Sequence, residues 1–153
     1  MNVYNLLKKC RVRGFTLPEM LLSVTLLTII GGMVIPSYHT FIVRNDLDIA
    51  TMTLAQNLRR AQALSQSSDG DMTWGVRLGV GSILVFKGSS YVSRDVDFDE
   101  NTQIPKSIVP TGLSEVAFSK VIGTPSATGT FTLTSQANEK RNVTINEKGM
   151  VDY

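Results

Sequence analysis

The sequence predicts an α+β protein in which one long N-terminal helix packs on an antiparallel β-sheet head. Three observations predict this fold class. An uncharged apolar run lies near the start of the chain, a stripe of Leu and Ala at helical spacing follows it, and the pattern changes after residue 66 to short β-like runs. The chain has 153 residues, a length that suits one domain better than two packed cores.

Charge is divided unevenly along the chain. Of the 15 basic side chains, four precede the first acidic residue, Glu19. Without residues 1–14 the chain carries 11 basic and 13 acidic side chains, a composition that argues against general nucleic-acid binding. The single cysteine, Cys10, excludes an intrachain disulfide. The four early basic residues are Lys8, Lys9, Arg11 and Arg13.

The apolar run predicts a membrane span. Met20 to Ile35 contains 16 residues without a charge, and the 21 residues from Phe15 to Ile35 contain only one charged residue, Glu19. A bilayer core needs about 20 mostly apolar residues. Because the basic residues precede the run, we expect a single pass with the N-terminus in the cytoplasm and the head outside it. An ordinary secretory signal fits less well, since the run is long and no A-x-A-like site follows it.

Glu19 distinguishes a plain anchor from a more specific segment. A lone carboxylate at the start of a span costs on the order of a few kcal/mol, so it usually has a partner. If the chain is cut between Gly14 and Phe15, the new α-amino group lies only four residues from Glu19. In an assembly, the amine of one subunit would then pair with Glu19 of another. The alternative is that Glu19 only extends to water at the headgroup boundary.

Residues 14–19, with the basic leader before them and the apolar run after them, resemble the class III signal of type IV pilins and type II secretion pseudopilins. Residues 35–38, Ile-Pro-Ser-Tyr, are similar to the proline-kinked exit of the pilin helix. Pro18 is a small departure, because many members carry Ile or Val there. A proline in the first turn of a helix costs little, since the N–H that it lacks has no intrahelical partner.

The resemblance implies how the chain matures and assembles. A prepilin peptidase of the inner, cytoplasmic membrane would remove residues 1–14 and methylate the amine of Phe15, with the methylation cofactor bound to the peptidase. Glu19 would neutralise a neighbour's amine in a pilus or pseudopilus. The implied partners are other pilins or pseudopilins, a platform protein and a cytoplasmic ATPase. The resemblance implies a structural subunit, not an enzyme, with no cofactor or metal of its own.

The sequence divides into four segments. These are a cleaved leader (1–14), a membrane-spanning and filament-core helix (15–36), an amphipathic helix half (37–66) and a β-rich head (67–153). We expect a kink at Pro36, which removes one helical hydrogen bond. Apolar residues at three- and four-residue steps predict that the second half packs on the head. This stripe is Leu47, Ala50, Leu54, Leu58, Ala61 and Leu64.

The head is predicted to be mostly strand, with hairpin turns at residues 79–81 and 146–149. Pro105 and Pro110 predict an irregular connection between residues 101 and 113. Parts of the head and residues 54–63 are also similar, more diffusely, to the GspH/FimT group of minor pilins. The expected strands are 72–78, 82–87, 91–98, 116–119, 129–134, 141–145 and 150–153.

Two features of the sequence raise other chemistries. Asp95, Asp97 and Asp99 alternate with apolar residues, which predicts a strand with one wet and one buried face. A calcium loop is the alternative, although Glu100 stands where such a loop needs glycine. His39 is the only histidine, and no catalytic or zinc-binding constellation forms around it.

Three functions therefore remain open from the sequence. The leading one is a minor structural subunit of a type II secretion pseudopilus or a type IV pilus. The second is a FimT-like DNA-binding minor pilin for DNA uptake, in which Lys140, Arg141 and Lys148 converge around the last hairpin. The third is a membrane-anchored enzyme or binding domain that is never processed.

Overall fold

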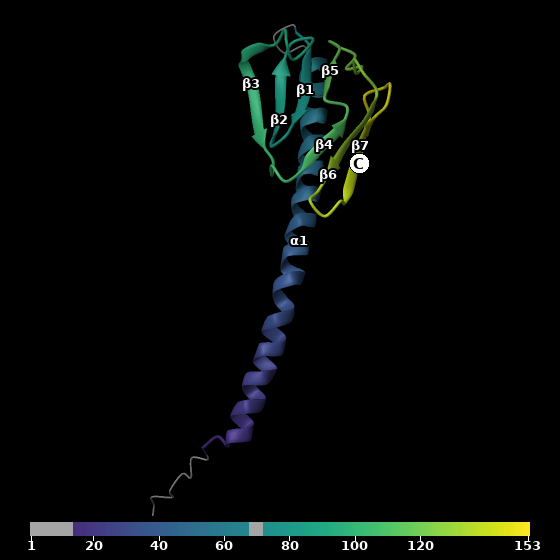
Figure 1. Ribbon diagram of the computed structural model, residues 1–153. Helices are drawn as coiled ribbons and strands as arrows, with labels where there is room; N and C mark the ends of the chain where they lie inside the picture. Colours follow the sequence, from purple (N-terminus) through teal and green to yellow (C-terminus); the bar gives the residue numbers. More distant parts are fainter. Residues whose placement is uncertain (1–13, 68–71) are drawn as a thin grey trace, which may run out of the picture. The chain divides into compact units, whose positions relative to one another are not determined.

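The computed structural model describes residues 14–67 and 72–153, except for the side chains of residues 33–40 (Figure 1). The chain divides into two compact units, Met1–Tyr38 and His39–Tyr153. The described residues form one helix followed by eight strands. The predicted leader therefore lies outside the described residues, except for Gly14.

Helix α1 (Leu17–Gln66) begins two residues later than the sequence predicts. The carbonyl of Thr16 accepts hydrogen bonds from the backbone N–H groups of Glu19 and Met20, each at 3.1 Å. Pro18 lies in this first turn, where its missing N–H removes no helical hydrogen bond. Helix α1 continues through Pro36. Because the Pro36 side chain is outside the described residues, the kink stays a prediction.

The second half of α1 carries the predicted stripe, and the prediction that it packs on the head is confirmed. Leu47, Ala50, Leu54, Leu58 and Ala61 are fully buried, and Leu64 packs against the same core. Burying one Leu side chain is worth about 1.5–3 kcal/mol. The strand side chains that complete this core include Trp74, Val76, Ile83, Val85, Val116, Phe118, Phe131, Leu133, Val143 and Ile145.

The head contains two antiparallel sheets of four strands each (Figure 1). The α+β fold class is therefore confirmed, and the β-rich head is divided into two sheets. The first sheet has the order β3-β2-β1-β5 and consists of β1 (Trp74–Gly79), β2 (Ser82–Lys87), β3 (Asp95–Gln103) and β5 (Glu115–Phe118). The second sheet has the order β4-β6-β7-β8 and consists of β4 (Val109–Gly112), β6 (Gly129–Thr134), β7 (Lys140–Ile145) and β8 (Val151–Asp152).

Two strand predictions were wrong. The strand expected at 91–98 starts at Asp95, because Tyr91 lies in a loop where its ring contacts arginine side chains. The region expected to be an irregular connection rather than a central strand, 101–113, contains the end of β3 and the whole of β4, which is an edge strand and not a central one. Pro110 fits in β4 because this strand is at the sheet edge, where one side needs no N–H donor.

The prediction of one buried face on β3 was also wrong. Val96 and Phe98 are 65% and 45% exposed, whereas the Asp99 side chain is only 17% exposed. Contacts with other parts of the chain, and not the alternation of residue types, decide which side chains of β3 are exposed. Arg94 pairs with Asp99 at 2.9 Å on one face, and Glu100 reaches Arg60 of α1 at 2.8 Å on the other. Because β3 is the edge strand, its apolar residues extend past the covered core.

Both predicted hairpin turns are present. Gly81 in the β1–β2 turn and Gly149 in the β7–β8 turn have φ values of 81° and 78°, in the left-handed region that glycine adopts without strain. The Gly149 turn lies beside α1, because a Cβ at this position would overlap the Gln62 side chain. These turns set the register of β1 with β2 and of β7 with β8.

Candidate processing and assembly site

The predicted cleavage point lies just before α1, outside regular secondary structure. Phe15 is 75% exposed. A Cβ built on Gly14 meets no atom of the described residues within 4 Å. The peptide bond between Gly14 and Phe15 is therefore open to approach in this unit. The cleavage itself is not tested by the structure and stays a prediction.

Glu19 folds back toward the start of the helix. Its Oε2 lies 3.4 Å from the backbone nitrogen of Thr16 and 3.5 Å from the Thr16 hydroxyl oxygen. The sequence reasoning missed this contact, although Thr-x-x-Glu at a helix start is the pattern of a capping box. Both contacts are long for hydrogen bonds. Among residues 14–67 and 72–153, the ion pairs do not include the Glu19 carboxylate.

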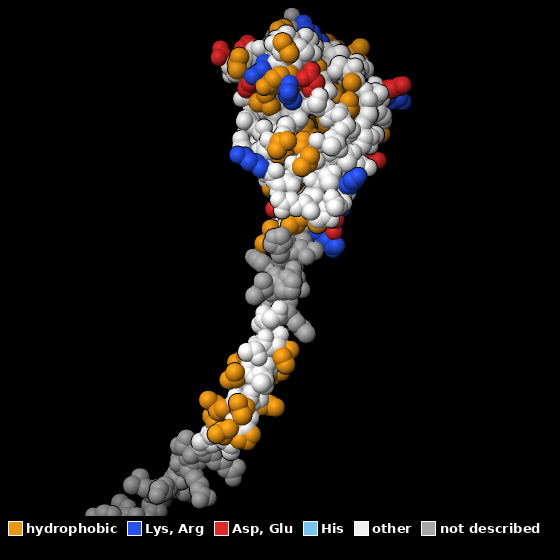
Figure 2. All heavy atoms as spheres, viewed as in Figure 1, with side chains coloured by type: hydrophobic (Ala, Val, Ile, Leu, Met, Phe, Trp, Pro, Cys, Tyr) orange, Lys and Arg blue, Asp and Glu red, His pale blue; other side chains and the backbone are white. Residues whose placement is uncertain are grey.

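The helix that follows Glu19 exposes apolar side chains at consecutive positions around its circumference, and Figure 2 shows those on the face toward the viewer. An apolar surface around the whole circumference is typical of a helix that other helices or lipid surround. Its few polar side chains bond within the helix, so they need no water. The Ser23 hydroxyl donates to the Glu19 carbonyl at 2.7 Å, and the Thr28 hydroxyl donates to the Thr25 carbonyl at 2.8 Å. The exposed apolar residues include Leu17, Leu21, Leu22, Leu26, Leu27, Ile29 and Ile30.

A membrane span was predicted for the same region. Among the described residues, no helix reaches the length and the apolar character that crossing a membrane requires. The predicted single pass is therefore not confirmed. The side chains of Pro36, Tyr38 and His39 lie outside the described residues, so the predicted helix exit and the histidine have no side-chain contacts to report.

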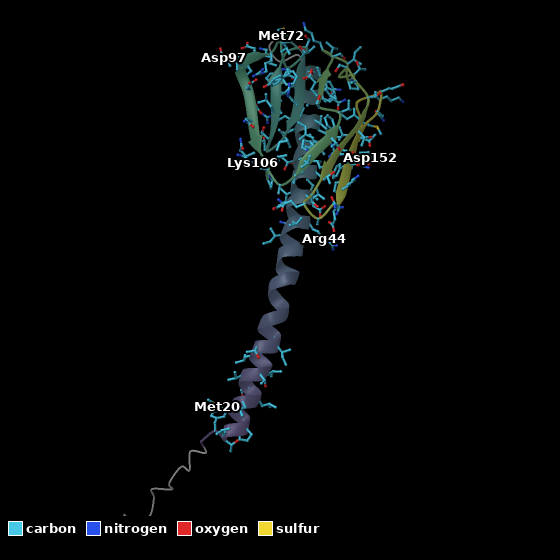
Figure 3. The ribbon with its side chains drawn as sticks, viewed as in Figure 1. Met20, Arg44, Met72, Asp97, Lys106 and Asp152 are labelled. Atoms are coloured by element: carbon cyan, nitrogen blue, oxygen red, sulfur yellow. The ribbon has the colours of Figure 1, made fainter. Side chains whose placement is uncertain are left out.

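The three basic residues of the DNA-binding hypothesis do not come together. Lys140 and Arg141 start β7, whereas Lys148 lies in the turn beyond its other end. From its first residue, Lys140, to its last, Ile145, β7 is roughly 17 Å long at about 3.3 Å per residue. Arg141 donates from Nε to Asp48 Oδ1 of α1 at 2.9 Å, and Glu139 beside it pairs with Arg44 at 2.7 Å. Both ion pairs join this end of the hairpin to α1, and the pair with Asp48 neutralises Arg141; Figure 3 labels Arg44 near this end of the hairpin.

The aspartates of the calcium alternative are also separated by their contacts. Asp99 pairs with Arg94, while an Asp95 carboxylate oxygen accepts a hydrogen bond from the backbone N–H of Asp97 at 3.3 Å. Asp97 lies at one end of β3 (Figure 3). Across residues 14–67 and 72–153, no three potential metal ligands of the His, Cys, Asp and Glu types gather in one place.

Two comparisons with known proteins agree on one class. The profile of the prokaryotic N-terminal methylation motif matches residues 9–35. The fold matches the minor pseudopilin EpsH from the type 2 secretion system of Vibrio cholerae with a TM-score of 0.53, covering 70% of this chain and 94% of that one at 15% identity. No curated protein sequence matches the chain.

The fold is pseudopilin-like, and the N-terminal segment carries the methylation motif. The methylation motif spans the predicted cleavage point, Glu19 and the apolar helix, and the chain has a pseudopilin-like α+β arrangement. Together they show an N-terminal methylation motif of the type IV pilin kind at residues 9–35 and a pseudopilin-like fold.

Proposed function

We propose that this chain is a minor structural subunit that is cleaved after Gly14 and then assembled into a type II secretion pseudopilus or a type IV pilus. The observation that carries the proposal is the first part of α1. Its apolar side chains are exposed around the helix and its hydroxyl groups bond to its own carbonyls. Such a surface is stable only when lipid or other apolar helices cover it.

The membrane comes first in this sequence of events. The basic leader keeps the N-terminus in the cytoplasm, and the apolar helix holds the precursor in the inner membrane as a single pass. A prepilin peptidase then cuts between Gly14 and Phe15 and methylates the amine of Phe15. The exposed position of Phe15 supports access to this bond.

Glu19 selects the neighbour during assembly. In the filament core its carboxylate would pair with the Phe15 amine of the next subunit, an arrangement that removes two unpaired charges from an apolar environment. The long contacts to Thr16, at 3.4 and 3.5 Å, support a carboxylate that is held near the helix start without being fully satisfied. A platform protein and a cytoplasmic ATPase would drive the assembly.

We do not extend the proposal to DNA uptake. Arg141 is already paired with Asp48, and Lys148 lies beyond the far end of β7. Binding to duplex DNA through phosphates needs several cations on one surface, and these three residues do not provide it.

The direct test is the mass of the mature chain. Protein extracted from membranes of cells that contain the prepilin peptidase should have 139 residues and begin with N-methyl-Phe15. Cells without the peptidase are the control and should contain only the 153-residue precursor. A full-length chain in both, or cleavage after Pro36, would contradict the proposal.

A further inference from the structure

The first sheet has a cavity on the face that points away from α1. Val76, Ile83 and Val85 of this sheet point into the core, so the residues that alternate with them point outward. One outward row crosses four strands in the order Glu115, Arg77, Leu84, Asn101. The cavity above this row has a volume of about 350 Å³, within the range of ligand sites. Its lining is Arg77, Gly79, Ser82, Leu84, Tyr91, Arg94, Asp99 and Asn101, and its one carboxylate, Asp99, is paired with Arg94.

The loop between β2 and β3 forms one wall of the cavity and places Tyr91 between two arginines. The guanidinium carbons of Arg77 and Arg94 lie 3.8 and 3.9 Å from the centre of the Tyr91 ring. Tyr91 also meets Phe86 of β2 edge to face at 6.3 Å. Contacts this close stack both guanidinium groups on the ring, so the Arg77 side chain is held in one place.

Hydrogen bonds fix the loop itself. The N–H of Gly88 donates to the Thr73 carbonyl at 2.7 Å, and the hydroxyl groups of Ser90 and Ser93 lie 2.8 Å apart. Nη1 of Arg94 donates to the Tyr91 carbonyl at 2.8 Å. The wall of the cavity is therefore organised before any ligand arrives, which lowers the entropy cost of binding.

The two arginines differ in how many hydrogen bonds their guanidinium groups donate. Nε of Arg94 donates to both carboxylate oxygens of Asp99, at 3.1 and 2.9 Å, and this hydrogen bond raises the pKa of Arg94. Arg77 has Glu115 at 3.8 Å, too far for a hydrogen bond, and donates no other hydrogen bond within the described residues. Its side chain is 42% exposed. Arg77 is thus a positioned guanidinium with free donors.

We propose that this cavity binds an acidic side chain from a segment of a neighbouring protein, with the carboxylate paired to Arg77. A guanidinium fork suits a carboxylate, since it donates two parallel hydrogen bonds. Ser82 and Asn101 provide hydrogen-bonding groups for the backbone of the segment, and Leu84 provides an apolar floor. The arriving carboxylate replaces Glu115, whose contact is long. The site lies wholly in the head, so it does not depend on processing or filament assembly.

The test uses the full chain in detergent micelles and the peptide acetyl-Gly-Glu-Ser-Gly-amide. The measured quantity is the NMR shift of the Arg77 Nε–H resonance during titration. We expect a saturable shift with this peptide, and at least about tenfold weaker binding of the matched Gln peptide, because it lacks the charge-assisted pair. Equal binding of the two peptides would overturn the proposal. Glutarate is the third ligand, and binding as tight as that of the peptide would overturn the assignment to a protein segment.

Two variants should change peptide binding in opposite directions. The NMR shifts of the Tyr91 ring measure the binding in each variant. Arg77→Gln should weaken peptide binding about tenfold, whereas Glu115→Gln should strengthen it severalfold by removing the competing carboxylate. The matched control is Arg59→Gln, because Arg59 of α1 lies over the ring of Tyr153 at 5.3 Å but does not line the cavity. It should leave binding unchanged. Unchanged or weaker binding in Glu115→Gln would contradict the proposal even if Arg77→Gln failed to fold.

Discussion

The two parts of α1 have the same secondary structure and opposite surroundings. In the first part, leucines such as Leu21 and Leu26 are more than half exposed. In the second part, Leu47, Leu54 and Leu58 are fully buried against both sheets. Residue type and helical conformation are alike, so the difference comes only from what each part contacts.

This difference shows which part of the helix is stabilised by contacts with the rest of the chain. The second part owes its stability to side chains of the head, because packing of an apolar face stabilises a helix more than propensity does. The first part finds no cover among the described residues. Under the proposed function lipid or other apolar helices cover it, and the following predictions test that contrast.

The largest effect is expected at Gly14, where a bulky substitution should abolish cleavage completely. In Gly14→Trp the prepilin peptidase should not cleave, because a bulky side chain blocks close approach of the backbone at the scissile bond. Intact mass of the membrane fraction measures the cleaved fraction, which should fall from nearly complete to none. Gly14→Ala is the matched control and should still be processed. Cleavage of the Trp variant at the same bond would show that the peptidase does not require a small residue at position 14.

The next effect is on stability and compares a leucine from each part of the helix. Leu54→Ala should lower the free energy of unfolding of the head by about 3 kcal/mol, since it leaves a cavity in a packed core. Leu26→Ala, at a position that is 56% exposed, should change it by less than about 0.5 kcal/mol. Urea unfolding of the full chain in micelles, followed by Trp74 fluorescence, measures both. Equal losses would show that the two parts fold as one core.

Glu19→Val should separate insertion from assembly. The variant should enter the membrane and be cleaved as before, because it removes a charge from an apolar segment. Crosslinking to other pilins should fall by about tenfold, since a neighbour's amine loses its partner. Thr16→Val is the control: it removes the hydroxyl contact to Glu19 but keeps the carboxylate. If Thr16→Val lowers crosslinking as much as Glu19→Val, helix capping explains the effect and amine pairing does not.

The smallest effect is expected for the charged residues of the β7 hairpin. The variant with Lys140→Ala, Arg141→Ala and Lys148→Ala should bind duplex DNA no differently from the unchanged chain, because neither binds appreciably at physiological salt. Fluorescence titration of the full chain against labelled duplex DNA measures this. Micromolar binding that weakens with salt and disappears in the triple variant would instead support the DNA-uptake hypothesis.

The sequence by itself determined the features that depend on neighbours along the chain. The buried stripe from Leu47 to Ala61 follows from helical spacing, and β2 and β6 were predicted at their observed bounds, 82–87 and 129–134. The processing motif at residues 14–19 is a contiguous pattern, so it too was readable without a structure. Its capping contact from Glu19 to Thr16 was readable in the same way, although it was overlooked.

The tertiary structure decided everything that joins distant residues. Periodicity does not say which strands pair, so the division into two sheets, the strand β4 and the exposure of Val96 and Phe98 on β3 were not predicted. The partners of the charged side chains were not predicted either. Arg141 meets Asp48 from 93 residues away, and Arg77 meets Tyr91 only because the loop after β2 folds back over the sheet. Such contacts depend on the packing of the whole head, and no local pattern encodes them.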